Sequence, residues 1–122
     1  MKTFRFSLQT ISAICITILL LNISNTRASS IRVRGLISEH TTWSADTVFV
    51  DSTVYVKRNA SLTIHPGTYV EFQGYYALSV SGKLIAVGTE ADPITFTSHD
   101  TSGFYNLIDT SGAWHGIRFE DY

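Results

Sequence analysis

Short apolar runs alternate with polar residues along most of this chain, and similar runs return at a nearly constant spacing between residues 46 and 98. Val54 and Val56, for example, stand 24 positions before Leu78 and Val80. Within a run, apolar residues recur at every second position, which is typical of β-strands with one buried face. Self-similarity at a period of about 20 to 50 residues marks a protein built from stacked repeats. The pattern therefore predicts a coil of short strands whose successive turns stack on one another.

Two further runs have counterparts one period later. We expect the following sets to be neighbours in space: Val70 and Phe72 with Ile94 and Phe96, and Leu62 and Ile64 with Leu84 and Ile85. Three strand-sized runs in each period predict three short strands per coil. The runs are rich in β-branched and aromatic residues, which favour strands over helices. A β-sandwich or barrel would show similar spacing, but the three-run phase favours an all-β solenoid.

Turn signals separate the runs. Pro66 followed by Gly67 predicts a type II turn, in which proline fixes φ at the second position and glycine adopts positive φ at the third. After this turn we expect Val70 and Phe72 to point into the core, with the residues that alternate with them pointing outward.

Residues 1–28 have the pattern of a secretory signal peptide. Lys2 and Arg5 precede an uncharged apolar run at 11–23, and small residues stand at positions 26 and 28, as expected just before a cleavage site. A membrane anchor is the alternative, but a span requires about 20 predominantly apolar residues. We expect cleavage after residue 28, export to the cell surface or beyond, and no membrane span in the mature chain.

Residues 29–45 predict a short strand followed by a polar turn region at 39–44 that holds one large aromatic residue, Trp43. A stack of coils leaves an apolar end that must be covered. We therefore expect an N-terminal cap with Trp43 as its lid. The alternative is that Trp43 is an exposed binding aromatic.

The first coils then occupy residues 46–122, with an inserted loop at 99–113. Ile117 stands 39 positions after Leu78, which is the period of 24 plus the length of this loop. Two or three coils are expected, and Ile117 and Phe119 are expected to stack on Leu78 and Val80.

The charge and cysteine content of the mature chain limit which kinds of partner and ligand it can bind. Removing residues 1–28 would leave six cations against ten acids, a net charge of about −4. No basic stripe remains that would predict nucleic-acid binding. The only cysteine, Cys15, lies in the predicted signal peptide, so the mature chain would hold neither a disulfide nor a thiolate metal ligand.

Four segments together resemble a known series: residues 60–67, 84–89, 93–98 and 114–119. They resemble the first coils of right-handed parallel β-helix proteins of the pectin-lyase-like superfamily, especially large secreted or surface proteins of Gram-negative bacteria. The resemblance covers residues 35–122. Because such proteins usually stack many coils, it implies that this chain is the amino-terminal part of a longer protein. It implies a fold and not an activity, since one scaffold can carry many functions.

Candidate chemistry is sparse. Polysaccharide lyases of the superfamily use clustered acids for calcium and a basic residue to take a proton. The residues that this chain could offer are Glu71 and Glu120 with Arg118, but Glu71 and Glu120 are expected on different faces of the coil. The four histidines do not have zinc-ligand spacing. We predict no catalytic, cofactor-binding or metal residues and no cofactor. Asn59-Ala60-Ser61 fits the N-glycosylation acceptor pattern, which is common by chance.

Exposed aromatics are the best surface candidates, namely Tyr75 and Tyr76 with Phe104 and Tyr105 in the insertion. Aromatic rings on a rigid coil can bind a glycan or a cell-surface protein. The sequence thus favours an exported, non-catalytic scaffold with a structural, adhesive or surface-binding role. One alternative is the amino-terminal part of a polysaccharide-active, lyase-like enzyme whose active site lies downstream. Another is a small, self-contained secreted β protein.

Overall fold

The computed structural model describes residues 28–102 and 113–121, and every regular element in these ranges is a β-strand. The predicted signal peptide and most of the insertion lie outside the described residues. The strands, in chain order, are β1 (Ser30–Ile37), β2 (His40–Trp43), β3 (Thr47–Val56), β4 (Ser61–Ile64), β5 (Tyr69–Phe72), β6 (Ala77–Val80), β7 (Lys83–Ala86), β8 (Thr95–Ser98) and β9 (Gly116–Phe119).

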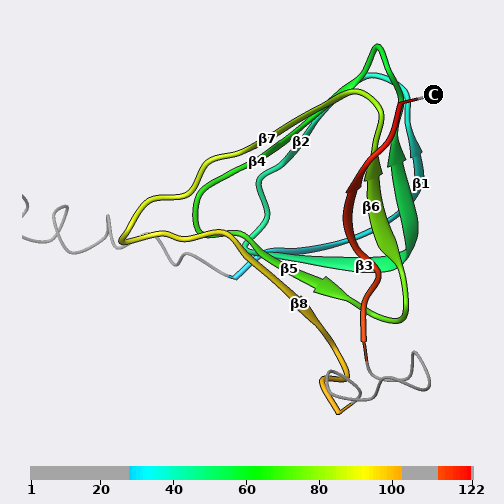
Figure 1. Ribbon diagram of the computed structural model, residues 1–122. Helices are drawn as coiled ribbons and strands as arrows, with labels where there is room; N and C mark the ends of the chain where they lie inside the picture. The colour runs from blue at the N-terminus through cyan, green and yellow to red at the C-terminus, as the bar shows by residue number, and fades with distance from the viewer. Residues whose placement is uncertain (1–27, 103–112, 122) are drawn as a thin grey trace, which may run out of the picture.

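The strands form the three sides of a triangular coil (Figure 1). Face A consists of the first halves of β1 and β3 with β5 and β8, and face B consists of the second halves of β1 and β3 with β6 and β9. Face C consists of β2, β4 and β7. All of these pairings are parallel. Neighbours on a face come from successive turns of the chain, so the predicted β-helical architecture is confirmed.

Register on face B follows the predicted period. Val54 pairs with Leu78, and Leu78 pairs in turn with Ile117. The same alignment places Val80 between Val56 and Phe119. The period therefore continues past the insertion, as expected from the 39-residue spacing of Leu78 and Ile117.

Register on face A differs from the prediction by two residues. Val70 pairs with Phe96, and Phe72 pairs with Ser98, so Ile94 lies before β8 rather than opposite Val70. The ring of Trp114 stacks on Phe72 with 4.5 Å between ring centroids and on Phe96 with 6.3 Å. The observed register thus brings Phe96 within stacking distance of Trp114 and places the small, buried Ser98 beside Phe72.

Two predictions for face C were also wrong in detail. Leu62 pairs with Leu84 as expected, but Ile64 pairs with Ala86 rather than with Ile85. Residues 40–43, expected within a polar turn region, form β2 and pair in register with β4. A polar segment can form such a strand because only every second side chain of a strand faces the core. In β2, Trp43 is the buried side chain, and it pairs with Ile64.

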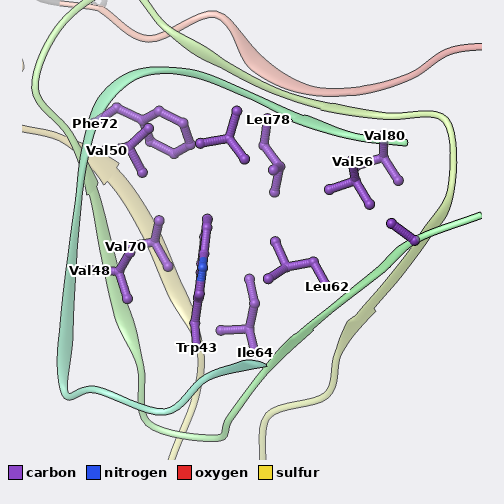
Figure 2. Close-up of a cluster of buried hydrophobic side chains, with 12 residues drawn as sticks. Trp43, Val48, Val50, Val56, Leu62, Ile64, Val70, Phe72, Leu78 and Val80 are labelled. Atoms are coloured by element: carbon purple, nitrogen blue, oxygen red, sulfur yellow. The ribbon is translucent and has the colours of Figure 1, made fainter. Parts of the chain in front are cut away.

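The core lies inside the triangle and consists of aliphatic columns around one tryptophan (Figure 2). Leu62, Val70 and Phe72 are 0% exposed, which confirms their predicted inward orientation. Trp43 is 2% exposed and packs in the same cluster, so it is not an exposed binding aromatic. Burial of such side chains contributes about 1.5–3 kcal/mol each relative to exposure. Apolar side chains of one turn pack on apolar side chains of the next, and this packing holds successive turns together.

Glycines define two of the corners. Gly67 has a φ of +79°, and the amide of Thr68 donates to the carbonyl of His65 at 3.3 Å, which agrees with the type II turn predicted at Pro66. Gly82 lies at the corner between faces B and C, directly against the Lys57–Ala60 turn of the preceding coil. A side chain there would meet backbone atoms, so the close stacking of these two turns requires glycine.

Candidate functional site on the outer surface

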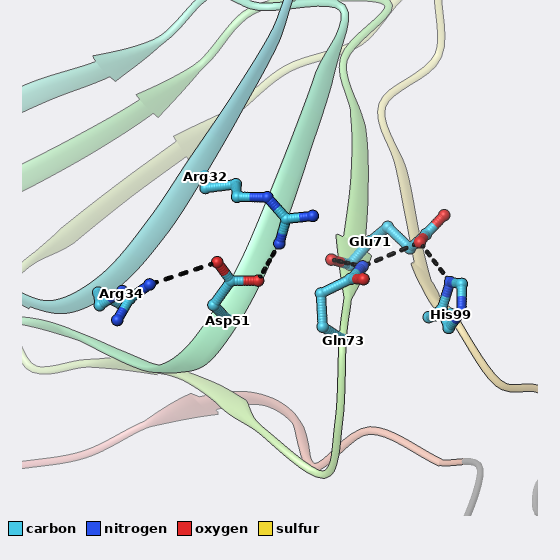
Figure 3. Close-up of polar contacts among 6 residues, drawn as sticks. All are labelled: Arg32, Arg34, Asp51, Glu71, Gln73 and His99. Carbon is cyan, nitrogen blue, oxygen red and sulfur yellow. Dashed lines mark hydrogen bonds and ion pairs between the residues drawn. The ribbon is translucent and has the colours of Figure 1, made fainter.

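Outward-facing polar side chains form two clusters on face A (Figure 3). In the first, Arg32 donates from Nη1 to Asp51 Oδ1 at 2.6 Å, and Arg34 Nη2 lies 3.7 Å from Asp51 Oδ2. The Arg32 guanidinium also lies over the ring of Phe49, 5.1 Å from its centroid. These contacts link β1 to β3 and give the Asp51 carboxylate its polar partners. The first cluster therefore has a structural role, and it is not a candidate for ligand binding.

The second cluster surrounds Glu71 on β5. Its Oε1 accepts a hydrogen bond from Gln73 Nε2 at 2.9 Å and lies 3.0 Å from His99 Nδ1. The Gln73 hydrogen bond is the main cause that lowers the pKa of Glu71; partial burial opposes it and His99 adds to it. The carboxylate thus keeps its charge in the fold and holds His99, the first residue of the predicted insertion, against face A.

Face B carries a hollow of about 300 Å³ on its outer surface. Its central rung consists of Tyr55, Ser79 and Arg118, which pair in register on β3, β6 and β9. Adjacent strands are about 4.8 Å apart, so the two long side chains flank a short one across about 10 Å. Ser79 is the floor. The hollow is lined by Thr53, Tyr55, Ala77, Ser79, His115, Arg118 and Glu120.

One end of this hollow meets the corner between faces A and B. There the rings of Tyr75 and His115 stack, with centroids 4.7 Å apart and planes inclined by 20°. The amide of His115 donates to the carbonyl of Tyr76 at 2.8 Å, which fixes the backbone of this residue to the coil below. Arg118 Nε lies 3.4 Å from Glu120 Oε1. The hollow therefore combines a phenol on β3 and a guanidinium on β9 with an imidazole and a carboxylate from the residues that directly flank β9.

The predicted aromatic residues have different environments. Tyr75 is 43% exposed and contributes to the corner just described. Tyr76 is half-buried and packs against the core. Phe104 and Tyr105 lie outside the described residues.

The sequence reasoning did not assign three residues of the hollow to a binding surface, namely Tyr55, His115 and Arg118, although it considered Arg118 for a lyase-like site. The signal was present for two of them. Tyr55, Ser79 and Arg118 each follow a member of the buried column Val54, Leu78 and Ile117, so the period that aligned the core also aligned this outer rung.

Comparison with known proteins decides the family. The family model of the pectate-lyase-like β-helix domain matches residues 35–119. The chain belongs to this family. Protein bark beetle of Drosophila melanogaster is 37% identical to it over 68 residues, which are 56% of this chain and 2% of that protein. No solved structure matches. The Gram-negative origin implied by the resemblance stays a prediction, because similarity to part of an insect protein does not decide it.

Acidic residues of this β-helix domain do not converge within residues 28–102 and 113–121. Glu71 lies on face A, whereas Glu120 and Arg118 lie at face B, so these three residues do not form one site. In the same ranges no three histidine, cysteine or acidic side chains are grouped as metal ligands. Nor does this part of the chain contain a helix long and apolar enough to cross a membrane.

A larger hollow, of about 450 Å³, lies at the amino-terminal end of the stack. It is lined by residues of β1 and by Trp43. The outer edge of β1 pairs with no other strand among the described residues, so this hollow lies at the end of the described stack and not between its turns. The face B hollow, built across three turns, is the better candidate for ligand binding.

Proposed function

We propose that this chain is an exported, non-catalytic segment of a β-helix scaffold that binds glycans at a cell surface through the face B hollow. One observation carries the proposal, namely the rung of Tyr55, Ser79 and Arg118 flanked by the stack of Tyr75 on His115. Membership of the pectate-lyase-like β-helix family supports the scaffold part of the proposal.

The chemistry of the hollow supports a sugar ligand. A tyrosine ring offers an apolar face with a polar tip, and the ring faces of sugars carry C–H groups that stack on such surfaces. Arg118 supplies donors only, whereas Glu120 supplies acceptors only. A hydroxyl group both donates and accepts, so a sugar can satisfy both residues at once. A protein partner with exposed hydroxyl groups is the competing ligand.

The binding part of the proposal is tested on the full chain, produced with its own leader and applied to immobilised glycans and to whole cells. Tyr75→Ala should weaken binding about two- to twelvefold, because loss of an aromatic contact worth about 0.5–1.5 kcal/mol raises the dissociation constant by that factor. Tyr69→Ala is the matched control, since Tyr69 is 40% exposed but lies on face A. Equal effects of the two substitutions would contradict binding at face B.

Export is tested separately by sequencing the amino terminus of the secreted protein. A mature chain that begins at Ser29 would support cleavage after residue 28. Retention of the intact chain inside the cell would contradict the proposal, whatever the result of the glycan assay.

A second function is favoured by the family match, whose description refers to pectate lyase. The chain would then be the amino-terminal part of a polysaccharide-active enzyme with its active site on later coils. The chain spans 2% of the Drosophila relative, which is consistent with a segment of a much longer protein. Sequence beyond residue 122 discriminates the two readings. Acidic and basic residues recurring at one outward strand position would favour the enzyme, and a secretion or anchoring domain would favour the surface protein.

A further inference from the structure

The corner between β3 and β4 carries the sequence Asn59-Ala60-Ser61, which matches the acceptor pattern for N-linked glycosylation. A modified asparagine must lie where a bulky, hydrated oligosaccharide can extend into solvent. Asn59 meets this requirement because it is exposed and lies in a tight turn between two strands.

The turn is held so that Asn59 faces outward. The amide of Ala60 donates to the carbonyl of Lys57 at 2.9 Å, which closes the turn, and the Ala60 side chain is 3% exposed. Ala60 thus anchors the corner in the core, while Asn59, the residue before it, stays at the surface. Gly82 packs against the turn from the next coil. No buried side chain needs to move to accommodate a group attached at Asn59.

The surroundings of Asn59 suit a sugar. The corner has a hollow of about 420 Å³ lined only by polar residues, namely Ser38, Lys57, Arg58, Asn59 and Ser81. A first sugar attached at Asn59 would therefore lie against hydroxyl and cationic groups, which can donate hydrogen bonds to it, rather than cover an apolar patch.

We propose that Asn59 is a site of N-linked glycosylation, with the oligosaccharide extending from the corner between faces B and C. This proposal rests on the proposed export, because the modification occurs in a eukaryotic secretory pathway. It therefore applies to the chain in a eukaryotic host and not to the Gram-negative origin that the resemblance implies. A second match to the acceptor pattern, Asn22-Ile23-Ser24, lies in the leader that cleavage would remove, so Asn59 would be the acceptor that remains.

The position of the glycan is also compatible with the proposed ligand site. Asn59 follows the end of β3, whereas Tyr75 precedes the start of β6. Since β3 and β6 run parallel on face B, the two residues lie at opposite corners of that face. A glycan at Asn59 would shield one corner and leave the stack of Tyr75 on His115 accessible.

The test uses the full chain expressed in insect cells with its own leader, followed by treatment of the secreted protein with peptide N-glycosidase F. The wild-type protein should lose apparent mass on treatment. The Asn59→Gln variant should already migrate at the treated position and should not change. Ser61→Ala should behave like Asn59→Gln, whereas Ser61→Thr should keep the glycan because threonine also satisfies the acceptor pattern.

A second version, with an established secretory leader in place of residues 1–28, separates the two proposals. A glycan on this version together with retention of the native version in the cell would overturn export and uphold Asn59 as an acceptor. Secreted protein from either version that shows no mass change on treatment would overturn the assignment of Asn59.

Discussion

Replacement of Gly82 by alanine is the sharpest test of how successive turns stack. The φ of Gly82 is not among the positive values found in the described residues, which occur at Gly35, Gly67 and Gly116, so alanine can adopt the backbone conformation. The added Cβ would fall well inside contact distance of the carbonyl oxygens of Lys57 and Ala60. These are backbone atoms of the turn below, so no side-chain rotation can relieve the overlap.

The magnitude follows from two contributions. Overpacking a tightly packed position costs about 1–3 kcal/mol. The turn that must move also holds the hydrogen bond from the Ala60 amide to Lys57 at 2.9 Å and that from the Lys83 amide to Ala60 at 3.0 Å, each worth about 1 kcal/mol. We expect Gly82→Ala to lower the free energy of unfolding by about 3–5 kcal/mol, a large part of the stability of a typical domain.

Urea unfolding followed by tryptophan fluorescence measures this loss, because Trp43 is 2% exposed in the fold. Gly35→Ala is the control. It has a φ of +76° and no atom within 4 Å of the added Cβ, so only backbone strain of about 1–2 kcal/mol is expected. If Gly82→Ala is no more destabilising than Gly35→Ala, Gly82 does not lie in close contact with the Lys57–Ala60 turn.

Two further predictions concern the core and the pH dependence. Phe72→Ala removes a buried ring that stacks on Trp114 and should lower the free energy of unfolding, measured in urea, by about 3–5 kcal/mol. The same change at Phe119, which is 74% exposed, should lower it by less than about 0.5 kcal/mol. Similar losses for the two variants would contradict the assigned core. The lowered pKa of Glu71 stabilises the fold above the usual carboxyl pKa, and this contribution is lost as the pH falls through the lowered value. Unfolding midpoints on acidification should therefore fall more steeply for wild type than for Glu71→Gln, and parallel curves would refute this role.

The local pattern of the chain was enough to identify the β-helix and the orientation of most strands. Alternation at every second residue decides which side chains face the core, and equal spacing decides which of them meet on the next turn. Val54, Leu78 and Ile117 obey both rules across the insertion. The same spacing also predicts that Tyr55, Ser79 and Arg118 lie side by side on the outer surface. The sequence reasoning used the spacing only for inward positions and so did not predict this rung.

Packing between turns decided the register of β8 and the arrangement of the candidate site. On β8, Phe96 stacks with Trp114, which follows the predicted insertion and also lies on Phe72, so no local window of sequence contains these contacts. The stack of Tyr75 on His115 likewise joins residues from two different turns. Periodicity therefore determined the fold, the buried face and most partners by itself, whereas the β8 register and the corner of the candidate site required the tertiary structure, because side-chain volumes from distant segments compete for the same space.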